Sequence, residues 1–160
     1  MEIIEYEEKY REDVKDLLVE LEEYLVSIDE DDLDQVGKDY REKLIDVDLK
    51  EVNDYEGKCY LAIEDNKAIG LIMGCIPPYD EEDYLDYKCP RRGRVTELVV
   101  TKNVRTKGIG QALMKKMEDY FKEVECEYIS IEVFAYNKHA IEFYEKGDYH
   151  ARCIDMIKKI

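Results

Sequence analysis

The sequence predicts a single α/β domain, and three observations lead to this fold class. The chain has 160 residues, a length that suits one domain with a sizeable buried core. Hydrophobic residues make up 45 %, as they do in ordinary globular proteins. Strand-like and helix-like hydrophobic patterns alternate along the chain, with no internal repeat and no Ser/Gly-rich linker between them. We therefore expect one domain over residues 1–160.

Strands and helices are predicted from their different hydrophobic periods. Short runs rich in β-branched and aromatic residues predict strands at residues 1–6, 59–64, 68–76, 94–101, 128–135 and 152–158. Apolar residues that recur every three or four positions predict helices at residues 9–26, within 27–49 after a loop, at 108–124 and at 137–146. The turn Asp65-Asn66-Lys67 joins two of the strands as a hairpin, and residues 79–92 form an acidic loop.

The charge of the chain restricts its partners. Asp and Glu number 40 against 24 Lys and Arg, so the formal net charge is −16. Nucleic acids and anionic membranes bind basic surfaces, and we expect neither as a partner. A cationic partner or substrate suits this charge, although an acidic surface that only aids solubility would look the same.

The cysteines and the N-terminus indicate a cytoplasmic protein. The chain has an odd number of cysteines, five, with no CxxC pair, and only two histidines. We therefore expect reduced thiols and no metal site. The first residues lack the pattern of a signal peptide, and no apolar run approaches the roughly 20 residues of a membrane span.

One segment is basic, although the chain as a whole is acidic. Residues 98–117 contain no Asp or Glu but five Lys or Arg residues. Within this segment a strand pattern leads to Gly108-Ile109-Gly110 and then to an amphipathic helix. The glycines allow a ligand close to the main chain, and the N–H groups and dipole of the helix attract anions. This order predicts a pyrophosphate site, and the alternative is a tight strand-to-helix turn without a ligand.

Residues 100–110, V-T-K-N-V-R-T-K-G-I-G, resemble the acetyl-CoA pyrophosphate motif of the GNAT superfamily of N-acetyltransferases, commonly V-x-P-x-x-R-G-x-G-I-G. Lys102 replaces the usual proline and Thr106 the usual glycine. The resemblance implies a main-chain cradle for the pyrophosphate and backbone pairing of the preceding strand with the acetyl and pantetheine groups. The residues that it assigns to acetyl-CoA are Leu98, Val99, Val100, Arg105, Thr106, Lys107, Gly108, Ile109 and Gly110.

A second motif strengthens the resemblance. Residues 133–146, V-F-A-Y-N-K-H-A-I-E-F-Y-E-K, follow the family pattern V-x(3)-N-x(2)-A-[IM]-x-[FL]-Y-E-K, but Gly147-Asp148-Tyr149 stands where Leu-Gly-Phe is usual. From the residues alone, Asn137 is a helix N-cap and Tyr144 a core residue. By resemblance, Asn137 binds the CoA arm, and Tyr144 protonates the departing thiolate. The implied fold is a mixed, mostly antiparallel sheet of about six or seven strands with helices on both faces.

Acetyl transfer to an amine needs a base, because an alkyl ammonium with a pKa of about 10 must lose a proton before it attacks. Two carboxylates are candidates: Glu132, in a predicted apolar strand, and Glu97, at the start of the apolar run of the central strand. The alternative for each is a carboxylate that faces water. The N–H group of Leu98 is a candidate donor to the oxyanion, whereas His139 is expected on the surface.

The family places the acceptor between the first two helices and the loop before the central strand. In this chain both parts are acidic, at residues 29–34 and 80–86, and the second has Tyr79, Tyr84 and Tyr87 nearby. Carboxylates and aromatic rings suit a cationic amine, such as a polyamine, an aminoglycoside or a basic peptide. Solvated acidic loops are the alternative.

These observations predict an N-acetyltransferase that moves the acetyl group of acetyl-CoA to a primary amine of a small molecule or peptide. Two other hypotheses stay open: a non-catalytic acyl-CoA-binding regulatory domain of the same fold, and an anion-binding interaction module. A homodimer is compatible with the sequence, which does not specify an oligomeric state.

Overall fold

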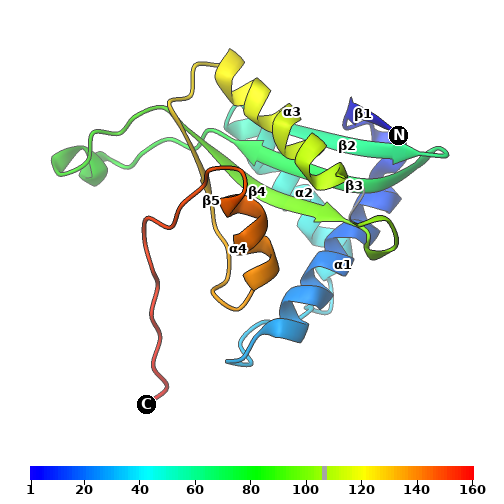
Figure 1. Ribbon diagram of the computed structural model, residues 1–160, viewed down its shortest axis with the longest axis horizontal. Helices are drawn as coiled ribbons and strands as arrows, with labels where there is room; N and C mark the ends of the chain where they lie inside the picture. Colours follow the sequence, from blue (N-terminus) through cyan, green and yellow to red (C-terminus); the bar gives the residue numbers. More distant parts are fainter. Residues whose placement is uncertain (106–107) are drawn as a thin grey trace.

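The computed structural model describes residues 1–105 and 108–160, which build a mixed sheet (Figure 1). Its strand order is β1-β2-β3-β4-β5, and only the β4–β5 pair is parallel. The strands are β1 (Glu2–Glu5), β2 (Lys58–Glu64), β3 (Lys67–Cys75), β4 (Arg92–Val100) and β5 (Tyr128–Ile131). The mixed, mostly antiparallel sheet is confirmed, with five strands in the described residues where six or seven were expected.

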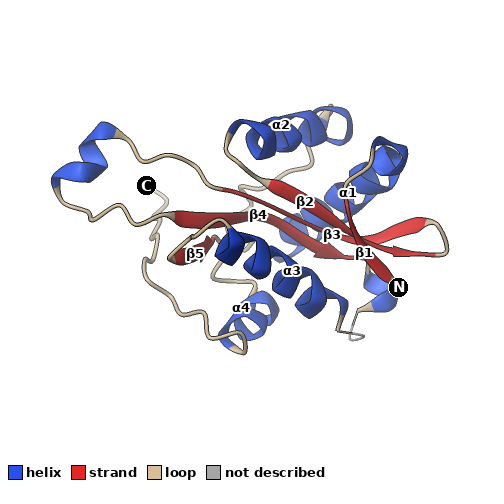
Figure 2. Ribbon diagram, turned by 90° about the horizontal axis from the view of Figure 1, so that it is seen from above, coloured by secondary structure: helices blue, strands red, loops and turns tan. Residues whose placement is uncertain are grey.

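Helices cover both faces of the sheet, as Figure 2 shows. The helices are α1 (Arg11–Ile28), α2 (Tyr40–Asp54), α3 (Ile109–Glu123) and α4 (Lys138–Glu145), with 3-10 turns η1 (Glu8–Tyr10), η2 (Glu81–Leu85) and η3 (Lys102–Val104). Two separate apolar clusters join them to the sheet. One cluster contains Leu17, Ile45 and Val99 beneath α1 and α2, and the other contains Leu113 and Phe121 beneath α3. Among the described helices, none combines the length and hydropathy needed to cross a membrane.

Three predicted boundaries are wrong. The segment 152–158 is not a strand: it belongs to an exposed, extended tail that leaves the sheet (Figure 1), and it pairs with no described strand. The strand predicted at 128–135 ends at Ile131, because residues 132–135 are exposed and have no strand partner. The second helix runs to Asp54 rather than ending near residue 49, because Val52 continues its buried face.

A bulge in β4 decides which residues face which helices. Met73 of β3 pairs with Glu97 and the next residue, Gly74, pairs with Val95, so Thr96 is left without a partner. An extra residue of this kind turns the side chains on either side of it to opposite faces. Val95 therefore packs in the cluster beneath α3, whereas Val99 packs beneath α1 and α2. Glu97 shares the face of Val99 because side chains alternate along a strand.

Candidate active site

The central strand β4 loses its neighbour halfway along. Strands β4 and β5 pair only from Arg92 with Tyr128 to Val95 with Ile131. On the other side, β3 continues to pair, and the N–H group of Thr101 donates to the carbonyl of Ile69 at 2.9 Å. Because backbone groups alternate along a strand, the N–H groups of Leu98 and Val100 point away from β3. An extended ligand can therefore pair with these two residues as an additional strand would.

Helix α3 begins next to this strand with an open N-terminus. Its N-cap is Gly108, whose φ of +76° lies in the left-handed region that favours glycine. Among the residues that the structure describes, no side chain caps the helix, and its first turn holds no acidic residue. The N–H groups of the first turn thus retain the partial positive charge that attracts a phosphate. The predicted contacts from Thr106 and Lys107 lie outside the described residues.

The Arg105 side chain points toward the strand and α1. Its Nε donates to the carbonyl of Val100 at 3.0 Å, and the guanidinium lies 5.5 Å from the ring centre of Tyr24. An Nη atom is also 3.8 Å from a carboxylate oxygen of Glu20. The side chain therefore fixes the start of the turn between β4 and α3.

Asn137 is a buried helix cap. It is 8 % exposed, and its Oδ1 accepts from the N–H group of Ala140 at 3.2 Å at the start of α4. The same oxygen accepts from the hydroxyl of Tyr24 at 3.2 Å. Tyr24 therefore links Arg105 of the first motif to Asn137 of the second. The sequence carries no signal for this role, because Tyr24 is 113 residues from Asn137 in the chain.

The Tyr144 phenol is in a setting that keeps it protonated. Its ring makes edge contacts with Phe143 and Tyr149, with centres 5.3 Å and 6.0 Å apart, and it lines a cavity of about 210 Å³ between α3 and α4. Burial and then the charge of Glu97 raise the pKa of Tyr144 to about 12. The hydroxyl is therefore available as a proton donor at neutral pH.

The two candidate bases occupy different environments. Burial, and then the charges of Asp48, Glu22 and Glu51, raise the pKa of Glu97 to about 8 against the lowering effect of Arg94. Glu132, in contrast, is exposed and lies just after the end of β5, not inside an apolar strand as predicted. His139 is exposed, as expected. The charge of Glu97 also raises the pKa of Tyr144.

Sequence reasoning missed the carboxylates that surround Glu97. Glu22 of α1 and Asp48 and Glu51 of α2 act on one another or on Glu97 through their charges. Asp48 is 8 % exposed, and burial followed by the charge of Glu51 raises its pKa to about 7. One signal was available: Ile45, Asp48 and Val52 share the buried face of α2, which places a carboxylate within an apolar stripe.

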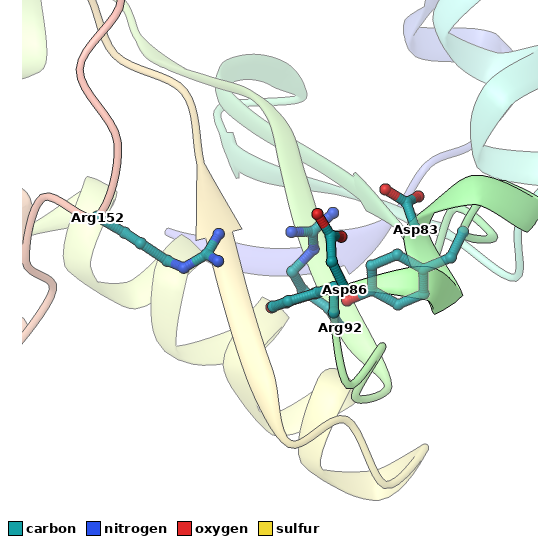
Figure 3. Close-up of a pocket in the computed structure, with 6 residues that line it drawn as sticks. Asp83, Asp86, Arg92 and Arg152 are labelled. Atoms are coloured by element: carbon teal, nitrogen blue, oxygen red, sulfur yellow. The ribbon is translucent and has the colours of Figure 1, made fainter.

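The two acidic segments expected around the acceptor lie at different ends of the molecule. Residues 29–34 follow α1, whereas residues 80–86 surround η2 in a loop that extends beyond the sheet (Figures 1 and 2). Near η2, the structure has a cavity of about 350 Å³ in which Asp83 and Asp86 lie beside Arg92 and Arg152 reaches in from the tail (Figure 3).

The tyrosines of this loop already hold cations of the protein itself. The guanidinium of Arg92 lies 5.1 Å from the ring centre of Tyr79, and that of Arg152 lies 4.9 Å from that of Tyr87. Two of the three rings expected to receive a cationic acceptor therefore lie against arginine side chains, whereas the third, Tyr84, is 65 % exposed.

The raised pKa of Glu97 predicts a pH-dependent stability difference. The carboxyl titrates near 8 when folded but at about 4.3 when unfolded, so stability falls as the pH rises between these values. Glutamine does not titrate, so Glu97→Gln should be more stable than the wild type at pH 9 and lose this advantage at pH 4. Urea unfolding at both pH values measures the difference in the free energy of unfolding between the variant and the wild type. Glu132→Gln, at an exposed position, is the control. An equal difference at both pH values would contradict the burial of Glu97.

Known proteins show the same fold and family. The family model for GNAT acetyltransferases matches residues 15–148. An uncharacterized N-acetyltransferase from Methanocaldococcus jannaschii is 32 % identical over 99 residues, which cover 61 % of this chain and 56 % of that protein. The match thus spans about half the length of this relative.

Two solved structures share the fold at low sequence identity. A mutant protein from Bacillus halodurans has a TM-score of 0.86 at 16 % identity, and the match covers 100 % of this chain and 99 % of that protein. An aminoglycoside N-acetyltransferase, solved in complex with CoA, has a TM-score of 0.67 at 14 % identity, and the match covers 99 % of this chain and 100 % of that protein. With the family model matching most of its length, this chain belongs to the GNAT family of acetyltransferases.

Proposed function

We propose that this protein transfers the acetyl group of acetyl-CoA to a primary amine that is cationic in solution. The proposal is carried by Glu97 and Tyr144 together, because a carboxyl with a raised pKa and a protonated phenol are the two proton carriers that the reaction needs, and the charge of Glu97 acts on Tyr144. The open N-terminus of α3 and the unpaired half of β4 support binding of the pyrophosphate and pantetheine of CoA beside them.

Each proton has a carrier in this mechanism. The Glu97 carboxylate takes a proton from the acceptor ammonium, and the free amine attacks the thioester carbonyl. A C–N bond forms, and the N–H group of Leu98 donates to the oxyanion. The C–S bond then breaks, and the thiolate takes the proton of the Tyr144 hydroxyl. The nitrogen of the new amide loses its extra proton, which passes through solvent to the Tyr144 phenolate and restores the hydroxyl. A base with a pKa near 8 is well matched to this task, since it accepts a proton readily yet is ionised at mildly alkaline pH.

The first test is binding of acetyl-CoA followed by turnover. Ligand at 100 times its Kd should add about 2.7 kcal/mol to the free energy of unfolding, which a thermal shift detects. Free CoA should then appear when a panel of diamines, aminoglycosides and peptides is added, and a thiol reagent measures it. A thermal shift without CoA release from any amine would indicate a non-catalytic CoA-binding domain. Absence of any shift would contradict the proposal.

The assignment of the base is tested by a matched pair of variants. Glu97→Gln should lower kcat/KM by about 10²-fold or more, because it removes the proton acceptor without changing the size of the side chain. Glu132→Gln should stay within about twofold of the wild type, since Glu132 is exposed. The wild-type rate should rise with pH up to about 8, and this rise should be lost in Glu97→Gln. The opposite ranking of the two variants would make Glu132 the base.

The role of Tyr144 is tested by Tyr144→Phe. This change should lower kcat by about 10²-fold and leave the Kd of acetyl-CoA within a few-fold, because it removes only the proton that the thiolate receives. Tyr128→Phe is the control, since Tyr128 is 63 % exposed at the start of β5. Turnover assays and calorimetric titration with acetyl-CoA measure the two quantities. An unchanged kcat would remove Tyr144 from the mechanism.

A further inference from the structure

Four carboxylates on the α1 and α2 side of the sheet act on one another through their charges, and we name them the inner acidic cluster. Its members are Glu22 of α1, Asp48 and Glu51 of α2 and Glu97 of β4. None of the four forms an ion pair within the described residues, where fourteen ion pairs occur elsewhere. A buried carboxylate without a positive partner is costly, so this cluster suits a cation supplied from outside the protein.

Asp48 is the member with the least compensation. It is more than nine-tenths buried, and its Oδ2 has no hydrogen-bond partner in the described part of the chain. Glu22, by contrast, accepts from the hydroxyl of Tyr40 at 3.2 Å, and Glu51 accepts a weak hydrogen bond from the thiol of Cys75 at 3.7 Å. Buried polar atoms in proteins are normally paired, so the orphaned oxygen of Asp48 points to a missing donor.

The sheet register locates Asp48 relative to Glu97. Cys59 of β2, Met73 of β3 and Glu97 of β4 form one row across the sheet, because each pairs with the next. Burial is the largest cause of the raised pKa of both the Cys59 thiol and the Glu97 carboxyl, and the charge of Asp48 is the second. Asp48 shares the buried face of α2 with Ile45 and Val52, which pack in one cluster with Cys59 and Met73. Asp48 therefore faces this row, whose middle residue is the apolar Met73.

The cluster reaches toward solvent at the start of α2. Tyr40, the first residue of this helix, is half-buried, and burial and the charges of Glu22, Glu97 and Asp48 all raise the pKa of its hydroxyl. The connection that precedes Tyr40 is mostly exposed. A slender molecule that enters beside Tyr40 would meet the acidic side chains in turn.

An organic cation fits this cluster better than a metal ion. Within the described residues, no group of three or more His, Cys, Asp and Glu side chains has the geometry to hold a metal. An ammonium group donates up to three hydrogen bonds, so it satisfies the free oxygen of Asp48. The apolar Met73 between Asp48 and Glu97 suits a methylene chain.

We infer that the acceptor is a small aliphatic diamine or polyamine, and that Asp48 binds the ammonium group that does not react. This inference rests on the proposed function, in which Glu97 takes the proton of the reacting amine. A monoamine would leave Asp48 without its donor. Asp48 is only 8 % exposed, so a bulky aminoglycoside or a peptide would be too large to bring an ammonium group to its carboxylate. The charge of Asp48 thus makes it a specificity determinant for a second cationic group.

The test compares two acceptors of nearly equal length, 1,4-diaminobutane and 1-aminobutane. The wild type should have a kcat/KM at least about tenfold higher for the diamine, and Asp48→Asn should reduce this preference about tenfold or more. Asn keeps the shape of Asp, and thermal unfolding shows whether the variant is folded. The matched control is Asp46→Asn, on the exposed side of the same helix, which should keep the wild-type preference.

Calorimetric titration with 1,4-diaminobutane gives a readout that does not depend on catalysis. The diamine should bind to the wild type and to Asp46→Asn, and at least tenfold more weakly to Asp48→Asn. This result would support the diamine site even if no amine were acetylated. In that case only the proposed function would fail. Turnover of 1-aminobutane or a peptide as efficient as that of the diamine would overturn the inference and leave the proposed function intact. An unchanged preference in Asp48→Asn would overturn it as well.

Discussion

The candidate site depends on the interruption of regular pairing along β4. After Val95 the strand gains an extra residue at Thr96 and loses β5 as its neighbour. The loss of β5 turns the N–H groups of Leu98 and Val100 into free donors, and the bulge turns Glu97 toward α1 and α2. A continuous ladder in this place would satisfy those backbone groups within the protein, so no extended ligand could pair there.

The burial of like charges is the second feature that distinguishes this molecule. Most of its acidic residues are on the surface, where water solvates them at little cost. The inner acidic cluster is different, because burial raises the pKa of both Asp48 and Glu97, and the charge of Asp48 raises the pKa of Glu97 as well. Such an arrangement opposes folding and persists where it serves a ligand or a reaction.

Contacts between distant segments hold the two motifs together. Tyr24 of α1 contacts both Arg105 and Asn137, so the first helix joins the turn before α3 to the start of α4. The acidic loop around η2, in contrast, packs its tyrosines against arginines of β4 and the tail. Its residue types resemble those of a cation site, yet Tyr79 and Tyr87 already lie against arginines of the protein itself.

The sequence by itself determined the local features: the helices, the order of the strands, the glycine turn before α3 and the asparagine cap of α4. These depend on residues a few positions apart, through hydrophobic period, backbone freedom and capping. It did not determine that residues 152–158 leave the sheet, since a strand pattern needs an available edge to pair with. Only the tertiary structure decided that Glu97 is half-buried and Glu132 exposed, and that the charge of Asp48 acts on Glu97. Burial and the distance between charges depend on strand register and helix packing across the whole chain.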